Sequence, residues 1–543
     1  MWRKNMRSHQ SLIYRKKYKC PVCNEYSLHI IHDLVCECEN ECDVDYCDKM
    51  EIESIISKNN FEGYYTLQDI DNLFYEIDND SVNRMFRKIT DDPLLKGMSD
   101  KQKKEIENLF AKTIEIDSQL DDITVKYMNK YKIKESDKLS TFSYVINLLE
   151  DIHHFLNLAW NDVCLFYYGS NLVKEKFYSE RFFFDNCVDH ISLATERIYV
   201  FLGIYYDFNF DSNLSNNRTI NIKKYLKKHS DFKGTKIKSL IDCASGSSII
   251  KDIRGYNIHD LSYLNNKIVK DIEKDPNKAD YYNADSTDIN KLELKIELPK
   301  ILKTIKQYYD VLFEAIQMMN NNSFNHKNIP MLEIFWNDIV NSKPVETQYS
   351  VNFCNDLNIE LSAVFAQLQL VESKYNIDVF FRINDIVHCI NDIFNIEAKH
   401  YFNKYHIDVR ESSFILQADK QYLLHSSVIR LYACYDKLSK YLNLIDKRYV
   451  NIQYFSDFNT FSFLENNVHD KKIRTIVDNE FYQKLEKLRN DIYHSLRPGC
   501  MGGKDAMNHF NNIIGQVVFE NTKIVLAFLE FIIENNLRKR GNI

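Results

Sequence analysis

The chain has 543 residues, of which 45% are hydrophobic, so its length predicts two to four domains with packed interiors. It holds only 12 glycines and 7 prolines, and because all-β folds need many tight turns, this scarcity favours long helices. The net charge of −7 excludes a polycation. No segment reaches the roughly 18 uncharged apolar residues of a membrane span. We therefore expect a mainly helical, cytoplasmic protein without a membrane partner.

Six of the 13 cysteines lie between positions 20 and 47, in a head that we delimit as residues 1–50. The sequence Cys20-Pro-Val-Cys23 is typical of the first half of a zinc ribbon, because two thiolates at this spacing can reach one metal ion from a tight turn. The alternating stretch Ser27–His32 predicts a strand. We expect a zinc-ribbon-like module that holds a structural zinc ion.

The second pair of zinc ligands must come from the four cysteines after this strand, which are Cys36, Cys38, Cys42 and Cys47. If a hairpin turns near His32-Asp33, Cys38 and Cys42 lie at the better distance from the first pair. Cys36 with Cys38 is an alternative, and His29 or His32 could also substitute. The many acids between positions 37 and 53 disfavour nucleic-acid binding by the head alone and favour a protein partner.

Residues 51–136 have a charged, helical pattern and form a predicted linker region. From 137 onward the chain is strongly amphipathic, and apolar residues from Val145 to Leu156 follow the i, i+3, i+4, i+7 rule of a helix. Further helices are predicted near 180–207, 248–266 and 298–320. We assign these helices to a first domain, residues 137–325.

The same order of helices is predicted a second time, after a helical connector at 326–375. The helices of this second domain, residues 376–543, are predicted near 379–402, 415–445, 479–496 and 506–537. A short similarity in sequence, Tyr206-Asp207 and Tyr435-Asp436, accompanies the repeat, and we expect both aspartates at the surface. We interpret the pattern as one four-helix unit used twice.

Two stripes of basic residues stand out in this acidic chain, at residues 1–19 and 223–238. Local stripes of this kind can meet phosphate groups even when the net charge is negative. The alternative is a solvated face or loop, because lysine-rich segments often serve solubility alone.

Each predicted domain contains one Arg-x4-His motif, and the chain contains no others. They are Arg254-Gly-Tyr-Asn-Ile-His259 and Arg489-Asn490-Asp-Ile-Tyr-His494. Both fall between the long second helix and the closing helix of their domain. This shared position raises the significance of a short motif. The alternative is an arginine and a histidine that merely cap a helix or bind a carboxylate.

The helix of the second motif predicts a mixed patch of amide, imidazole and guanidinium groups. Its buried stripe is predicted at Leu485, Leu488, Ile492 and Leu496. Asn490 and His494 are four residues apart and share a face, which the long Arg489 side chain can reach. Histidine exchanges protons near neutral pH, and arginine binds phosphate oxygens in a bidentate manner. Such a set suits phosphodiester cleavage without a metal ion.

The second motif resembles that of the HEPN superfamily, whose hallmark is an arginine, usually followed by a polar residue, and a histidine four to six residues after the arginine. The resemblance implies helical bundles that pair, so that two motif helices face one cleft. It implies catalytic roles for Arg489, Asn490, His494, Arg254 and His259, although Gly255 stands where the polar residue is usual.

The resemblance further implies a metal-independent endoribonuclease, in the class of toxin or phage-defence effectors, with no cofactor for catalysis. RNA is then the expected partner, together with a possible antitoxin or other protein, and a homodimer is possible. The alternative function is a non-catalytic HEPN scaffold that binds RNA or a protein.

Overall fold

The computed structural model describes three strands of the head and most of the chain from residue 89 onward. The described residues are 18–19, 26–32, 35–38, 89–130, 136–171, 180–210, 218–245, 248–259, 263–276, 286–321, 329–330, 363–364, 367, 374–396, 415–416, 420–494, 496–497 and 503–539. The chain divides into two compact units, Met1–Asp91 and Asp92–Ile543. Both Arg-x4-His motifs belong to the second unit.

The first unit contains a small antiparallel sheet in the order β1-β2-β3. Its strands are β1 (Tyr18–Lys19), β2 (Tyr26–His32) and β3 (Val35–Cys38). Strand β2 confirms the predicted strand. Its pairing with β3 brings the backbones of His32 and Val35 opposite each other, which agrees with the hairpin that the sequence analysis considered near His32-Asp33. The short helix η1 (Ile89–Asp91) also belongs to this unit.

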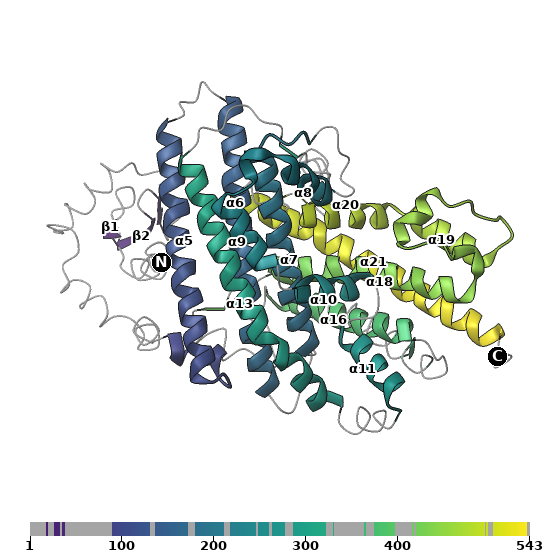
Figure 1. The fold of residues 1–543 in the computed structure, drawn as a ribbon. Helices are drawn as coiled ribbons and strands as arrows, with labels where there is room; N and C mark the ends of the chain where they lie inside the picture. The colour runs from purple at the N-terminus through teal and green to yellow at the C-terminus, as the bar shows by residue number, and fades with distance from the viewer. Residues whose placement is uncertain are drawn as a thin grey trace. The chain divides into compact units, whose positions relative to one another are not determined.

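The second unit is mainly α-helical (Figure 1). In chain order its helices are η2 (Pro93–Leu95), α5 (Asp100–Lys130), α6 (Ser136–Asn171), α7 (Glu180–Tyr205), α8 (Arg218–Lys228), η3 (Ser230–Phe232), α9 (Lys236–Ser245), α10 (Ser248–His259), α11 (Tyr263–Lys274), α13 (Ser286–Asn321), α16 (Lys374–Ile396), α18 (Lys420–Ile445), η4 (Lys447–Tyr449), η5 (Phe455–Thr460), α19 (Val468–Val477), α20 (Glu480–His494) and α21 (Gly503–Lys539). Within the described part, no helix has the length and apolar character needed to cross a membrane.

The predicted helices that fall on described residues are confirmed, although several of their bounds differ. The helical connector at 326–375, residues 51–88 of the linker region and the basic stripe at 1–19 lie almost wholly outside the described residues. The helix expected near 248–266 is two helices, since α10 ends at His259 and α11 begins at Tyr263. The closing helix of the first set begins at Ser286 rather than near 298, so Pro299 lies inside α13. Proline has no backbone N–H, and at this position it removes one hydrogen bond from the helix.

Helices α6 and α7 form the core of the first half of this unit. They pack along each other, and α13 covers both, while α5 covers α6 and α13. The apolar positions predicted to be buried are Val145, Leu148, Leu149, Ile152, Phe155 and Leu156, and all are fully buried. Apolar burial on several sides of α6 supplies most of the stabilisation expected for such a bundle.

Helices α16, α18, α20 and α21 form the second half. Helix α18 packs against the other three, and α21 also contacts α16 and α20. The apolar and aromatic residues at helical spacing in α18 are all buried: Val428, Leu431, Tyr432, Tyr435 and Leu438. Helix α18 is therefore the central helix of this half, as α7 is in the first.

The two halves meet in a reciprocal way (Figure 1). The motif helix α10 packs against α7 of its own half and against α18 of the other half. The motif helix α20 packs against α18 of its own half and against α7 of the other. Each motif helix therefore contacts the central helices of both halves.

Each half contains a buried ion pair at an equivalent position, and these two pairs show which residues of the halves correspond. In the first half, Arg197 Nε of α7 lies 3.1 Å from Asp151 Oδ2 of α6. In the second half, Arg430 Nε of α18 lies 3.9 Å from Asp385 Oδ2 of α16. Each arginine lies two residues before a tyrosine, Tyr199 or Tyr432 in turn, and equivalent residues are 233 or 234 positions apart.

With this correspondence, the Tyr-Asp pairs of the two domains, Tyr206-Asp207 and Tyr435-Asp436, are not at equivalent positions. Asp207 is exposed and lies just beyond α7, with a φ of 59° in the left-handed region that aspartate tolerates. Asp436 is fully buried within α18 and accepts a hydrogen bond from the Phe455 backbone N at 2.9 Å. The expectation of a surface position was therefore wrong for Asp436, because its carboxylate holds the segment that follows α18.

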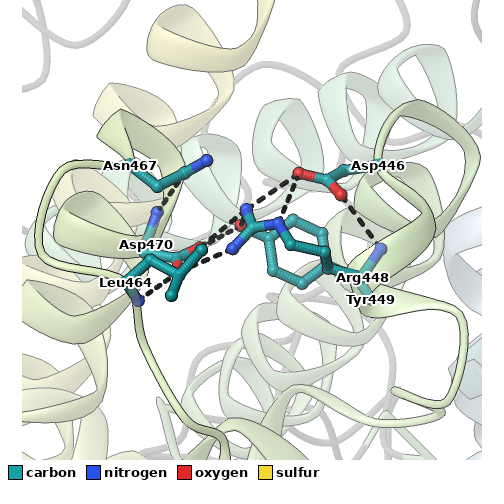
Figure 2. A network of polar contacts seen from close by, with 6 residues as sticks. All are labelled: Asp446, Arg448, Tyr449, Leu464, Asn467 and Asp470. Carbon is teal, nitrogen blue, oxygen red and sulfur yellow. Dashed lines mark hydrogen bonds and ion pairs between the residues drawn. The ribbon is translucent and has the colours of Figure 1, made fainter.

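A polar network anchors the segment between α18 and α20 (Figure 2). The Arg448 guanidinium donates to both carboxylate oxygens of Asp470, at 2.9 and 3.1 Å, and to Asp446 Oδ2 at 2.8 Å. Asp470 also accepts from the Leu464 backbone N at 2.6 Å and from the Tyr449 hydroxyl. The network ties η4 to the start of α19, just ahead of the second motif helix.

Candidate functional site

Helix α20 presents the second motif from a well-anchored position. Its start is capped by Asn479, whose Oδ1 accepts from the Phe481 backbone N at 2.9 Å. The predicted apolar stripe, Leu485, Leu488, Ile492 and Leu496, is buried. Because this stripe faces the bundle, Arg489 and Asn490 lie on its flank, where both are half-buried.

The Arg489 guanidinium is held by two tyrosine rings and an amide. Its Cζ lies 4.8 Å from the centroid of the Tyr432 ring and 4.9 Å from that of the Tyr493 ring. Its Nη1 donates to Asn490 Oδ1 at 2.9 Å. Among the described residues Arg489 forms no ion pair, and its Nε has no hydrogen-bond partner. Of the five guanidinium N–H groups, one donates to Asn490, the buried Nε–H is unpartnered, and no described carboxylate accepts from any of them.

The Arg254 guanidinium, on α10, lies on the same Tyr493 ring. Its Cζ is 4.7 Å from the ring centroid. Unlike Arg489, it has a carboxylate partner, since its Nη1 lies 3.4 Å from Glu196 Oε1 on α7. Glu196 accepts a further hydrogen bond from the Thr219 hydroxyl on α8. Burial alone would lower the pKa of Arg254, but Tyr493 and Glu196 raise it overall, so the side chain stays charged.

Tyr493 therefore joins the two motifs. Its side chain is 1% exposed, and burial, followed by the charge of Asp189, raises the pKa of its hydroxyl well above the ordinary value. The phenol is accordingly neutral at physiological pH, and its ring attracts cations through the negative potential of its faces. The contact brings together arginines that lie 235 residues apart in the sequence.

A buried carboxyl group lies close to this cluster. Asp189 of α7 is 5% exposed, and its Oδ1 has no hydrogen-bond partner among the described residues. Burial raises the pKa of Asp189 to about 6, and Asp185 adds to the rise, whereas Arg430, Arg254 and Arg382 oppose it. The charge of this carboxyl group, next to Arg254 and Tyr493, consequently changes in the mildly acidic range.

Lysines of α8 add positive charge next to Arg254. Lys223 Nζ lies 4.3 Å from the centroid of the Tyr199 ring. Burial lowers the pKa of Lys223; Glu196 opposes this, and Arg254 and Lys251 add to it. The basic stripe at 223–238 thus falls on α8, η3 and α9, and most of its lysines are exposed. The positive charge of these exposed lysines can attract phosphate groups.

The structure brings the two motif arginines together but does not describe the histidine side chains. His259 and His494 are the last residues of α10 and α20. Their imidazoles lie outside the described residues, so their roles stay predictions. Asn490, expected to orient the arginine, the imidazole or the phosphate, accepts its hydrogen bond from Arg489.

Three residues of this cluster escaped the sequence reasoning: Tyr432, Tyr493 and Glu196. Tyr493 lies inside the second motif, but its role depends on a contact from the other half. Tyr432 had a usable signal in the repeated Arg-x-Tyr of Arg197-Ile-Tyr199 and Arg430-Leu-Tyr432. Glu196 had none, because only the packing of α10 on α7 brings it to Arg254.

The predicted metal site falls in the head. The side chains of Cys20, Cys23, Cys38 and Cys42 lie outside the described residues, so structural zinc stays a prediction. In the part of the chain that is described, no cluster of three His, Cys, Asp or Glu side chains suits a metal ion. The described cysteines of the helical unit are free, and all are buried except Cys243, which is exposed.

Comparison of this chain with protein-family models, with curated proteins and with solved structures finds no match.

Proposed function

We propose that this chain is a HEPN-type endoribonuclease that cleaves RNA without a metal ion. In the reaction the ribose 2′-OH attacks the adjacent phosphorus, the bond to the 5′-oxygen breaks, and a 2′,3′-cyclic phosphate and a 5′-hydroxyl remain. The observation that carries the proposal is the contact of Arg254 and Arg489 with the single ring of Tyr493. Two motifs that meet at one point are what a composite site requires.

The packing of the helices supports this proposal. Each motif helix contacts the central helices of both halves, and the ion pairs of Arg197 and Arg430 repeat in the same register. These features are consistent with two HEPN-like four-helix bundles paired within one chain. A pair of this kind carries both half-sites by itself and does not need a second copy of the protein to form the cleft.

The cluster suits the charge changes of the reaction. Arg489 would stabilise the negative charge that grows on the phosphorane-like transition state, because its fork is pre-oriented by Asn490 and two rings. His494 would act as general base on the 2′-OH or as general acid on the leaving 5′-oxygen. His259 would supply the complementary proton transfer from the first motif. A structural zinc ion in the head would leave this chemistry unchanged.

A non-catalytic scaffold that binds RNA or a protein partner is the second candidate. The observation that favours it is that both arginines already have partners inside the protein. Arg254 pairs with Glu196, and Arg489 is bonded to Asn490. For the endoribonuclease RNA is the expected ligand, and a toxin or phage-defence effector with a protein partner such as an antitoxin is the setting we propose.

The deciding experiment compares RNA cleavage by the wild type, Arg489→Ala and His494→Ala in the presence of EDTA. We expect cleavage by the wild type and a loss of about 10²–10⁴ in rate for His494→Ala, since a proton-transfer group is removed. Arg474→Ala is the control, because this arginine is exposed on α19 and pairs with Asp478 at 3.7 Å. Thermal melting of each variant verifies that it is folded.

Two results would contradict the proposal. One is an unchanged rate for His494→Ala. The other is loss of wild-type cleavage in EDTA while metal analysis shows that the head has kept its zinc. Binding of RNA without cleavage by the wild type would instead support the scaffold.

A further inference from the structure

We propose that the two arginines have different tasks, an inference that rests on the proposed function. Arg489 binds the phosphate at the cleavage point. Arg254 is a positioning residue that acts through the ring of Tyr493 and does not bind the phosphate. The two half-sites are then unequal, with the chemistry centred on the second motif.

The two arginines differ in the charge of their partners. Arg254 already faces the Glu196 carboxylate at 3.4 Å, and a phosphate would have to displace that carboxylate. Thr219 holds Glu196 from the other side, so displacement also breaks a hydrogen bond. Arg489 faces only the neutral amide of Asn490, at 2.9 Å, and forms no ion pair with any described residue. Arg489 therefore stabilises an incoming phosphate more than Arg254 does.

The residues at equivalent positions around the two arginines also differ. The position of Glu196 is taken by Ile429 in the second half, so Arg489 has no equivalent carboxylate. The position of Asn490 is taken by Gly255 in the first half, where a Cβ atom would meet nothing within 4 Å. Packing would thus admit a side chain at Gly255, and the absence of an orienting amide beside Arg254 is not forced by the fold.

The two arginines also differ in the aromatic rings that they contact. In the second half the Tyr432 ring holds Arg489. The equivalent ring in the first half, Tyr199, holds Lys223 instead. The aromatic contact of Arg254 in the described part of the chain is with Tyr493, which comes from the other half. Arg254 thus holds the ring on which Arg489 depends for its own orientation.

The first test exchanges each arginine for lysine and measures RNA cleavage. Arg254→Lys should stay within about fivefold of the wild type, because an ammonium can still pair with Glu196 and lie on the Tyr493 ring. Arg489→Lys should lose about 10²-fold or more, since an ammonium cannot reproduce the bidentate fork. Equal losses at the two positions would overturn the inference and indicate a symmetric phosphate clamp.

The second test is a double-mutant cycle on the turnover rate with Arg254→Ala, Tyr493→Leu and the double variant. If Arg254 acts through the ring, its substitution should have little further effect once the ring is gone. Independent, multiplicative losses would overturn the inference. Tyr493→Phe is the matched control, since it keeps the ring and should preserve the effect of Arg254→Ala. It also guards against a Tyr493→Leu protein that does not fold.

A third measurement separates failure of this inference from failure of the proposed function. Binding of RNA with 2′-O-methyl riboses, which lack the nucleophile, should weaken in Arg489→Ala and change little in Arg254→Lys. A wild type that binds RNA without cleaving it overturns the proposed function alone, and the lysine comparison is then made on affinity. A wild type that neither cleaves nor binds RNA overturns both.

Discussion

At the scale of single residues, the cluster around Tyr493 shows how a neutral ring can hold two cations close together. A cation on a tyrosine face contributes about 0.5–2 kcal/mol, depending on how far water is excluded. Glu196 offsets the charge of Arg254, so the repulsion between the two guanidinium groups is reduced. Arg489 is left as the cation whose charge is available to a ligand.

Asp189 gives this cluster a pH dependence that can be measured on the protein's stability. Its pKa of about 6 in the folded state exceeds its ordinary value of 3.8, so folding disfavours its ionised form. The wild type should therefore lose up to about 2–3 kcal/mol relative to Asp189→Asn as the pH rises from 4 to 7. Urea unfolding of both proteins across this range measures the difference. Parallel curves would show that Asp189 is not buried as described.

The motif arginines were predictable because a repeated short motif is visible in the sequence itself. The partners of these arginines were not, because the contact between Arg254 and Tyr493 joins helices from different halves. Asp436 was placed at the surface for a related reason. Nothing in its local sequence shows that it accepts a hydrogen bond from the Phe455 backbone.

At the scale of helices, the long elements were predictable and the short ones were not. Helices α6, α7, α18 and α21 run for at least seven turns, so their apolar periodicity repeats often enough to be recognised. Helices α8, α9 and α19 have 10 or 11 residues, and their patterns are too brief to be distinguished from polar loops. Helix α19 depends instead on the network of Figure 2.

That network predicts a pH dependence of the opposite sign at Asp470. Burial favours its neutral form, but hydrogen bonds from Arg448 and Leu464 lower its pKa below the ordinary value. Asp470→Asn should lose about 2–3 kcal/mol of unfolding free energy at pH 7, because charged hydrogen bonds are removed. The loss should shrink as the pH falls below about 4, where the carboxyl group of the unfolded chain takes up a proton. Its pH-dependent part should be gone once the pH is below the lowered pKa of the folded carboxylate.

Asp478→Asn is the matched control for this substitution, because Asp478 is exposed at the end of α19. We expect a change within about 0.5 kcal/mol at pH 7. A comparable loss in both variants would show that the network does not hold the segment before α20.

At the scale of the whole helical unit, a buried polar network links the two halves. Tyr422 of α18 donates to Asp162 of α6 at 2.7 Å and accepts from Asn186 of α7 at 2.7 Å. Arg430 donates to Asn186 and, at 3.0 Å, to the backbone oxygen of Phe182. Arg497, just after α20, donates to the buried Asp151 through its backbone N at 2.8 Å. These contacts hold the second motif helix against the first half.

The sequence predicted two equal bundles, and it could not predict how they cross. The order of helices repeats along the chain, but the reciprocal packing of α10 and α20 depends on the shapes of the central helices. The unequal environments of Arg254 and Arg489 arise from this crossing. Cleavage of RNA at one composite site would therefore depend on a tertiary contact, that of Arg254 and Arg489 with Tyr493.

The most direct test of that claim is analysis of the ends of the RNA product. Wild-type protein is incubated in EDTA with an RNA and with the same sequence carrying 2′-O-methyl riboses throughout, and the products are identified by mass spectrometry. We expect 2′,3′-cyclic phosphate ends from the RNA and no cleavage of the methylated strand, because the nucleophile is blocked. Cleavage of the methylated strand, or products with 5′-phosphate ends, would contradict it.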